Sequence, residues 1–397
     1  MSRVLPERPP PAAILGCLAF LLIGWCGLLV PSLVRSIEHD FGQTDAGIGI
    51  FFFLNAVAYV TGSLGGGAVT ERIGRRRVLA TAAVLGSASL AALATVGTWP
   101  LFLLAAVPFG LGCGAIDGGG NALILDMFPD ARGRALNLLH LFFSLGALSS
   151  PFVVGRLVEA GVAWQAVMLG TGLVAIPLAI LLAVTGMPTG RHAAEAGNGS
   201  RAVAGRLTLD PILLILALAI ALYVASEIGV SNWLVRFLSS APLATATTAL
   251  TLFWAGLTLG RLISARLADR FDHARFAATS AVVMAVALVG AVVAPSLPVS
   301  VALFALAGFV SGPIYPLIVA IGGERFPARS AAVGGFLSGT AVIGGIFYPP
   351  VMGFMSVTIG LPAAMIGTAL LALACAGVLV LVGRRPTATE QLADSKP

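Results

Sequence analysis

Long apolar stretches alternate with short polar segments along the whole chain. Twelve of the stretches are long enough for a helix to cross a hydrocarbon core of about 30 Å, which takes about 20 residues. Backbone groups in lipid must be paired within their own segment, so each stretch is predicted to form a helix. The expected helices cover residues 13–36, 46–67, 78–97, 100–126, 135–158, 164–186, 209–231, 244–265, 276–294, 297–321, 331–354 and 361–383.

The second half of the chain repeats the first at a constant shift of 198 residues. The shift carries Gly62, Glu71, Arg72, Gly114, residues 126–129, Gly146, Pro151 and Gly155 onto Gly260, Asp269, Arg270, Gly312, residues 324–327, Gly344, Pro349 and Gly353. This predicts an all-α membrane protein with two pseudo-symmetric six-helix bundles, at residues 1–187 and 208–397, joined by a flexible cytoplasmic linker at 188–207. Membrane proteins with two repeated halves are most often transporters.

Composition agrees with this pattern. Hydrophobic residues make up 58% of the chain and charged residues 10%, whereas a soluble domain carries about 25% charged residues. The polar loops that hold most arginines fall on one side of the predicted membrane, so both termini are predicted to be cytoplasmic, in a bacterial-type inner membrane. The net charge of +6 then follows from topology and gives no support for nucleic-acid binding.

Several chemistries have no support in the sequence. Cys17, Cys26, Cys113 and Cys375 lie inside predicted helices without paired spacing, so neither a disulfide framework nor a metal site is expected. No ATP-binding loop is present, and no cofactor is predicted. The polar tail after Arg385 is predicted to be disordered. The first helix is predicted to be retained, because it is long for a signal peptide.

A charged loop between the second and third predicted helices resembles a known signature. Residues 67–76 read Gly-Ala-Val-Thr-Glu-Arg-Ile-Gly-Arg-Arg, with a degenerate copy at 265–270. The loop resembles Gly-x-Leu-Ala-Asp-Arg-x-Gly-Arg-Arg of the major facilitator superfamily, and the resemblance extends over the whole chain. It implies the major facilitator fold and a gating latch in the outward-facing state. The candidate gating residues are Glu71, Arg72, Arg75, Arg76, Asp269 and Arg270; the alternative is that the arginines only set topology.

The predicted helix 100–126 contains an acidic residue among many glycines. Six glycines lie within residues 110–120, where they let backbones approach closely or line a cavity. Asp117 and Asn121 are four residues apart and share a face. A carboxylate inside the membrane costs about 3 kcal/mol on insertion scales. Asp117 is therefore a candidate proton carrier, cation ligand or acceptor for substrate hydroxyls. The alternative is a buried carboxylate satisfied by a neighbouring helix.

The predicted helix 135–158 carries a polar face. Asn137, His140 and Ser144 follow helical spacing along it. His140 is a candidate for proton exchange with Asp117, because an imidazole titrates near neutrality. The alternative for His140 is a polar hydrogen bond between helices. The pair of His140 and Ser144 is not accompanied by a nucleophile turn, so an intramembrane enzyme is not expected.

The predicted helix 209–231 supplies a second acid. Tyr223 and Glu227 share a face, and Trp233 is expected at the outer interface, where Trp is favoured. This segment, together with Asn121 and residues 140–147, is similar to the fucose–galactose–glucose permease branch of the superfamily. That similarity implies proton-coupled sugar transport through membrane-embedded carboxylates. The sugar permease of that branch has acids in its first and fourth helices, but here residues 14–34 hold none. Glu227 is the candidate that replaces the missing acid.

Aromatic and amide residues complete a candidate binding pocket. Flat rings flanked by hydrogen-bonding groups suit a sugar, although packing or lipid contact is the alternative for each ring. The candidate substrate-binding residues are Trp25, Asn55, Tyr59, Asn121, Asn137, Tyr223, Asn232, Trp254 and Tyr315. Arg261 is a candidate ligand for a carboxylate substrate, and its alternatives are to reach the cytoplasmic face or to pair with an acid.

The sequence therefore predicts a secondary active transporter that moves a small polar solute, a sugar or polyol, by alternating access with proton symport. Asp117, Glu227 and His140 are the candidate proton-coupling residues. The expected partners are the solute, protons (or Na⁺) and membrane lipid, and the chain is expected to be a monomer. The alternatives are a proton-driven exporter of drugs or metabolites, a sodium-coupled symporter, and a sensor that binds a ligand without transporting it. The sequence gives less support to the exporter alternative, because residues 150–155 match the exporter signature poorly.

Overall fold

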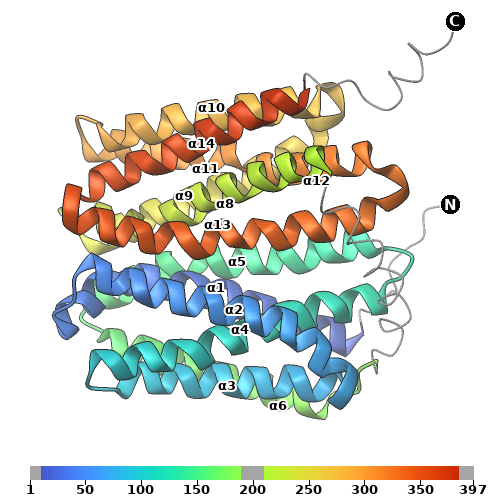
Figure 1. Ribbon diagram of the computed structural model, residues 1–397. Helices are drawn as coiled ribbons and strands as arrows, with labels where there is room; N and C mark the ends of the chain where they lie inside the picture. Colours follow the sequence, from blue (N-terminus) through green and yellow to red (C-terminus); the bar gives the residue numbers. More distant parts are fainter. Residues whose placement is uncertain (1–9, 189–209, 384–397) are drawn as a thin grey trace, which may run out of the picture. The chain divides into compact units, whose positions relative to one another are not determined.

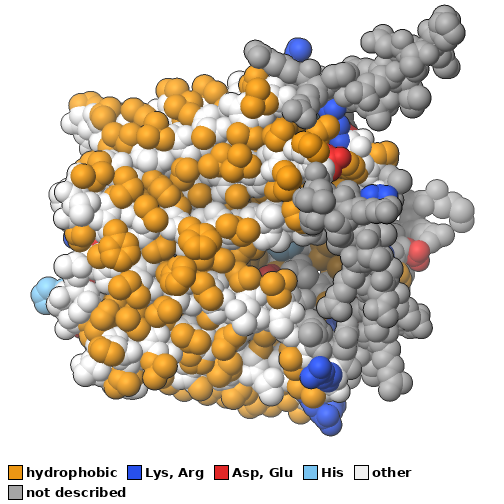
Figure 2. All heavy atoms as spheres, viewed as in Figure 1, with side chains coloured by type: hydrophobic (Ala, Val, Ile, Leu, Met, Phe, Trp, Pro, Cys, Tyr) orange, Lys and Arg blue, Asp and Glu red, His pale blue; other side chains and the backbone are white. Residues whose placement is uncertain are grey.

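The computed structural model describes residues 10–188 and 210–383. The predicted linker, apart from its first residue, and the polar tail lie outside this range. Among the described residues, twelve spans are long and apolar enough to cross a membrane, and no strand occurs. Hydrophobic side chains cover most of the face drawn in Figure 2. The predicted all-α, multi-pass membrane fold is thereby confirmed.

Within each half, the helices follow one another along the chain with short connections (Figure 1). In the first half they are α1 (Pro11–Phe41), α2 (Asp45–Ile73), α3 (Arg75–Thr95), α4 (Trp99–Met127), α5 (Arg132–Glu159) and α6 (Trp164–Val184). In the second half they are α8 (Pro211–Phe237), α9 (Leu243–Leu267), η1 (Ala268–Arg270), α10 (His273–Val292), α11 (Leu297–Ser311), α12 (Ile314–Arg325), η2 (Pro327–Arg329), α13 (Ser330–Ile359) and α14 (Leu361–Gly383).

Several helices end later than predicted, among them α1, α2 and α8, and one predicted helix is divided. The first helix continues beyond residue 36 to Phe41, because polar residues at the end of an apolar stretch still form helix outside the hydrocarbon layer. The stretch predicted as one helix at 297–321 is divided into α11 and α12. The division falls at Gly312 and Pro313; proline lacks the backbone N–H that a continuous helix needs, and its ring clashes with the preceding turn.

The chain forms two compact units. The first contains α1 to α6 together with residues 238–251, and the second contains α8, the part of α9 from Leu252 onward, and α10 to α14. Within the first unit, the Arg35 guanidinium of α1 donates hydrogen bonds to the carbonyl oxygens of Leu238 and Ala241. The Thr251 hydroxyl donates to the Leu148 carbonyl of α5 at 3.3 Å. These bonds attach the start of α9 to α1 and α5.

The same helix pairings occur in both units. In the first, α1 packs on α5, α2 on α4 and α3 on α6; in the second, α8 packs on α13 and α10 on α14. Gly256 and Gly260 of α9 meet α11, which completes the set. The 198-residue shift places each of these pairs on its counterpart, as the sequence repeat predicts.

Glycines permit the closest of these contacts. A Cβ added at Gly114 of α4 would lie 1.9 Å from the Tyr59 carbonyl oxygen of α2. A Cβ at Gly146 of α5 would lie 2.0 Å from the Leu21 carbonyl oxygen, and one at its repeat partner Gly344 would lie 2.0 Å from that of Ala221. No side chain fits at such distances, so these glycines let helix backbones touch, one of the two roles expected for the glycine-rich helix.

We expect Gly114→Ala to destabilise the protein by about 1–3 kcal/mol, because the added methyl group must push α2 away from α4. The measurement is thermal unfolding of the purified protein in detergent. The control is Gly65→Ala in α2, where an added Cβ meets nothing within 4 Å. Equal unfolding midpoints for the two variants would show that the α2–α4 contact yields easily, contrary to this expectation.

Candidate functional site

A polar stripe on α2 lies along the glycines of α4. Asn55, Tyr59 and Ser63 are spaced one turn apart on α2, and each lies beside a glycine of α4. These glycines are Gly110, Gly114 and Gly118. A Cβ added at each would lie 2.4, 1.9 and 2.3 Å from the carbonyl oxygens of Asn55, Tyr59 and Ser63, respectively. The Asn55 side-chain oxygen is buried and accepts no hydrogen bond from a described residue. The close backbone contact thus brings this polar face of α2 against α4.

The Asp117 carboxylate lies at this contact and has neutral hydrogen-bonding neighbours. The Asn121 amide donates to its Oδ1 at 3.0 Å, and the Ser63 hydroxyl donates to its Oδ2 at 3.4 Å. The Tyr59 hydroxyl is a third hydrogen-bonding neighbour. An ionised carboxylate only accepts hydrogen bonds, so three neutral donors offset part of the cost of burying its charge without cancelling that charge.

We call Tyr59, Ser63, Asp117 and Asn121 the Asp117 cluster. Three of its members were predicted as site residues, and the structure brings them together. Ser63 was missed by the sequence reasoning. Two signals pointed to it: it lies one helical turn after Tyr59, and the 198-residue shift carries it onto Arg261.

Other candidates of the first unit lie apart from this cluster. The His140 ring of α5 packs edge-on against Phe20 of α1, with ring centroids 5.5 Å apart. Phe20 in turn lies against Gly120 of α4, where an added Cβ would come within 2.5 Å of the Phe20 ring. Asn137 is exposed on α5. The Trp25 indole donates to the Thr171 hydroxyl of α6 at 3.1 Å, so its polar atom serves helix packing.

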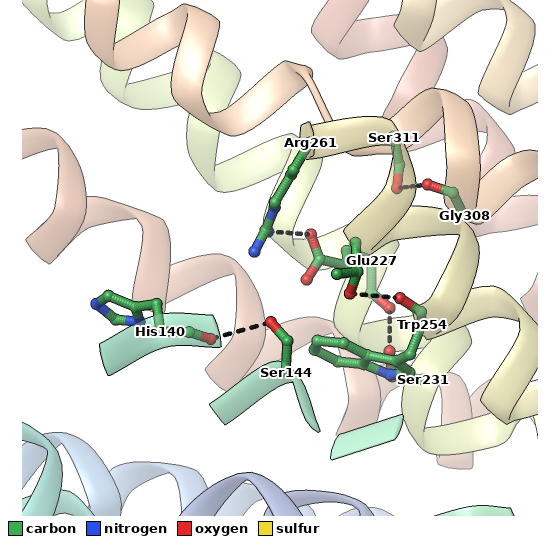
Figure 3. A network of polar contacts seen from close by, with 9 residues as sticks. His140, Ser144, Glu227, Ser231, Trp254, Arg261, Gly308 and Ser311 are labelled. Carbon is green, nitrogen blue, oxygen red and sulfur yellow. Dashed lines mark hydrogen bonds and ion pairs between the residues drawn. The ribbon is translucent and has the colours of Figure 1, made fainter. Parts of the chain in front are cut away.

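The second unit contains an acid and a base within its helices (Figure 3). Glu227 of α8 is buried, with 8% of its side chain exposed, whereas the Arg261 side chain of α9 is 38% exposed. Arg261 Nη2 lies 3.9 Å from Glu227 Oε2, which is longer than a hydrogen bond. The Arg261 Nε is buried without a hydrogen-bond acceptor among the described residues. Arg261 therefore pairs with an acid, one of its expected alternatives, while part of its donor capacity is unused.

Polar groups surround the Glu227 carboxylate. The Tyr223 hydroxyl is buried and neighbours the Glu227 carboxylate and the Ser311 hydroxyl. The Ser231 hydroxyl donates to the Glu227 carbonyl at 2.9 Å. A buried donor without an acceptor is costly, so the unpaired Arg261 Nε suits a water molecule or a polar ligand group at this pocket. Glu227, Arg261 and Tyr223 form what we call the Glu227 cluster.

The remaining candidates of the second unit have separate surroundings. Trp254 of α9 is buried, and Asn232 of α8 is half-buried. The Tyr315 hydroxyl of α12 and the Ser338 hydroxyl of α13 are hydrogen-bonded at 3.0 Å. The shift of 198 residues carries Asp117 onto Tyr315 and His140 onto Ser338. Tyr315 and Ser338 bond to each other, whereas Asp117 and His140 contact other residues.

Trp233, which is expected at the outer interface, lies near the end of α8, and its side chain is fully buried within the second unit. Its indole N–H donates to the Pro349 carbonyl of α13 at 2.9 Å. A buried indole needs such a partner, and the contact between α8 and α13 supplies it.

The candidate gating loop contains one buried arginine and several exposed ones. Arg75 is 2% exposed, and its Nη1 lies 2.7 Å from Asp126 Oδ2 at the end of α4. The 198-residue shift carries this ion pair onto His273 and Glu324, whose Nδ1 and Oε1 are also 2.7 Å apart. Arg72, Arg76 and Arg270 are exposed, and the side chains of Glu71 and Asp269 lie outside the described part of the chain. Arg75 thus holds α3 to α4 within its own unit.

Comparison with known proteins identifies a family. The model of the Major Facilitator Superfamily matches residues 13–243 and 215–397. The glucose/galactose transporter of Brucella abortus is 24% identical over 358 residues, which are 85% of each chain. The 4-hydroxybenzoate transporter PcaK of Pseudomonas aeruginosa is 30% identical over 189 residues, which are 47% of this chain and 40% of that protein.

Solved structures share the fold. A bacterial homologue of the human lysosomal transporter Spinster, in an inward-facing and occupied conformation, superposes with a TM-score of 0.78 at 15% identity, covering 94% of this chain and 96% of that one. The D-xylose–proton symporter superposes with a TM-score of 0.73 at 17% identity, covering 93% and 96%. At these identities the likeness concerns the fold alone.

We expect Arg75→Gln to lower the free energy of unfolding by about 1.5–3 kcal/mol, because it removes a charge-assisted hydrogen bond to Asp126. Thermal unfolding in detergent measures the change. Arg134→Gln is the control, because Arg134 is exposed at the start of α5 and belongs to no such pair with a described residue. If the two variants unfolded at the same temperature, the Arg75–Asp126 pair would contribute nothing to the stability of the first unit.

Proposed function

Because this chain belongs to the Major Facilitator Superfamily, whose members are transporters rather than enzymes, we propose that it carries a sugar or polyol by alternating access, coupled to proton symport. We also place both of its termini on the cytoplasmic side of a bacterial-type inner membrane. The observation that carries the proposal is the Asp117 cluster, a half-buried carboxylate inside a membrane span with neutral donors around it.

The charge of Asp117 supports proton coupling. The neighbours that contact its carboxylate are an amide and two hydroxyls, so gaining a proton changes the net charge of the cluster from negative to neutral. A buried negative charge resists closure of the surrounding helices, because it is expensive in a water-free site. Proton binding and solute binding then favour the same closed state, and that difference in affinity between states drives the cycle.

The Glu227 cluster has a different role in this proposal. Glu227 already lies next to the positive charge of Arg261, so the pair is close to neutral as it stands. Protonation of Glu227 would release the Arg261 guanidinium for another acceptor. Tyr223 adds a buried hydroxyl beside them. We propose that the Glu227 cluster binds the solute. Proton binding and release at Asp117 then couple the transport cycle to the proton gradient.

The chemistry of both clusters suits hydroxylated solutes. Hydroxyl, amide and carboxylate groups bind sugar hydroxyls, and the buried ring of Trp254 offers an apolar face. The similarity to a glucose/galactose transporter over 85% of the chain supports the same class. We further propose that Arg72 and Arg270, with Glu71 and Asp269, form the gating latch that the superfamily signature implies.

A second candidate is an organic acid as the solute. The Arg261 side chain is 38% exposed and retains unused donors, which suit a carboxylate. The match to a 4-hydroxybenzoate transporter over 47% of the chain supports this class. The two candidates differ in charge balance, because a neutral sugar with a proton carries current whereas a monocarboxylate with a proton does not.

We expect pulses of neutral sugars or polyols to evoke inward positive current in sodium-free liposomes on a solid-supported membrane. Asp117→Asn should abolish the sustained current, because the amide cannot take up and release a proton. Glu159→Gln, a matched change at an exposed acid at the end of α5, should leave the current intact.

Three outcomes would reject parts of this function. Current that appears only when sodium is present would show that the coupling ion is sodium and not the proton. Silence towards every sugar, with a response to amphipathic cations, would favour an exporter. Undiminished current in Asp117→Asn would remove Asp117 from coupling.

We expect Arg261→Gln to separate the two solute classes. If the solute is an organic acid, its half-saturating concentration in an uptake assay should rise by about tenfold or more, because a charge-assisted contact is lost. If the solute is a sugar, the rise should be smaller. Arg266→Gln is the control, because Arg266 is exposed on the same helix. Unchanged uptake of 4-hydroxybenzoate or any other transported acid in Arg261→Gln would exclude Arg261 as its carboxylate ligand.

A further inference from the structure

A groove lies between α3 and α6 on the outside of the first unit. It has a volume of about 410 Å³, and small side chains of α3, such as Ala80, Ala88 and Ala91, line it. Larger side chains stand at its edges with much of their area exposed, among them Val84 at 57% and Leu173 at 64%. Both helices belong to membrane spans, so the groove opens towards lipid. Its lining is almost entirely apolar and suits a hydrocarbon chain.

The groove runs along most of α3 and α6. Its lining extends over about 16 Å of α3, from Ala80 to Ala91, and over about 21 Å of α6, from Leu169 to Ala183. The acyl chains of one leaflet span about half of a hydrocarbon core of about 30 Å, so the groove is long enough for one acyl chain. One end of the groove lies close to the start of α3, where such a chain would enter from the leaflet on that side.

Two arginines stand where the head group of such a lipid would lie. Arg76 and Arg77 are in the first turn of α3, one helical turn before Ala80, and helical spacing places them on the side of α3 that carries the groove. Both are exposed, and neither forms an ion pair with a described residue. Figure 2 shows blue basic side chains gathered at this end of the first unit. The combination is an apolar groove with two positive charges at its mouth.

The preceding arginine does not share this role. Arg75 is buried and bound to Asp126, and this contact fixes the rotation of α3 so that the next two positions face outward. At the equivalent start of α10, the shift of 198 residues gives Ala274 and Arg275 in place of Arg76 and Arg77. There Asp272 caps the helix by accepting a hydrogen bond from the Arg275 backbone N–H, which adds an acidic residue beside the single arginine. The second unit therefore lacks the double positive charge.

We propose that the α3–α6 groove is a binding site for one anionic phospholipid of the surrounding membrane. One acyl chain lies in the groove, and the phosphate and negatively charged head group bind Arg76 and Arg77. Basic residues at the membrane surface attract anionic lipids, and an arginine pairs with phosphate through two parallel hydrogen bonds. A zwitterionic lipid offers the same chains without the net charge, so the site discriminates by head group. Nothing in this site depends on the solute that the protein carries.

Native mass spectrometry of the purified protein tests the proposal. The full chain is reconstituted with equal amounts of phosphatidylglycerol and phosphatidylcholine of identical acyl chains, then extracted and analysed for retained lipid. Wild type should retain one phosphatidylglycerol in preference to phosphatidylcholine. The double variant Arg76→Gln/Arg77→Gln should lose this preference, with retention lowered about tenfold or more. Ala88→Phe, an enlargement at an exposed position in the groove, should lower retention while both arginines remain.

The matched control is Arg132→Gln/Arg134→Gln, which removes the same charge from the exposed start of α5. Equal losses of phosphatidylglycerol in the two double variants would overturn the site. The anionic lipid would then be attracted by the whole basic end of the protein and not by Arg76 and Arg77. Equal retention of both lipids by wild type would overturn the head-group contact. Displacement of the lipid by glycerophosphoglycerol, which has no acyl chains, at the same concentration would overturn the role of the groove. Size-exclusion profiles and unfolding midpoints equal to wild type establish that each variant is folded.

Discussion

The contact of backbone against backbone between α2 and α4 is the constraint on which the candidate site depends. At Gly114 any side chain would collide with the Tyr59 carbonyl oxygen, and the same holds at the neighbouring glycines along the stripe. Because the helices touch, the short side chain of Ser63 reaches the Asp117 carboxylate on the opposite helix. A wider separation would take the Ser63 and Tyr59 hydroxyls of α2 away from the carboxylate and leave it only the Asn121 amide of its own helix. The glycines of α4 therefore bring hydrogen-bond donors of α2 to the Asp117 carboxylate, in addition to packing the two helices together.

The two units use the same scaffold for different charges. The 198-residue shift relates Ser63 to Arg261, so a neutral donor in the first unit corresponds to a cation in the second. It also relates the buried Leu29 of α1 to Glu227 of α8, and Asp117 of α4 to Tyr315 of α12. Each unit thus has a candidate coupling acid within a membrane span, Asp117 in α4 and Glu227 in α8, on helices that do not correspond. In the proposed cycle the first unit gains or loses charge with a proton, whereas Glu227 of the second unit lies beside the opposite charge of Arg261.

The sequence predicted the helices and placed Asp117 and Asn121 on one helix face, because each depends on the spacing of residues along a single segment. Contacts between helices were harder. Spacing placed His140 on a polar face of α5, but only the structure shows its ring against Phe20. Likewise the Trp25 and Trp233 indoles find partners on other helices, at Thr171 and Pro349. Periodicity tells which residues share a face, and it does not tell which neighbour that face meets. The repeat relates helix pairs between the halves but not each side-chain contact, since Tyr315 bonds to Ser338 whereas Asp117 and His140 have other partners.

The start of α3 shows how one buried ion pair organises the residues after it. Arg75 turns inward because Asp126 of α4 binds it, and each later residue is rotated by about 100° around the helix. Arg76 and Arg77 consequently point away from α4 and towards the side where the groove with α6 begins. In the second unit His273 takes the place of Arg75 and pairs with Glu324 at the same distance, so α10 is oriented in the same way. The next two positions of α10 differ from those of α3, because Ala274 and Arg275 present one charge instead of two. The repeated anchor therefore preserves helix orientation in both halves, while the exposed positions beside it are open to acquire separate partners.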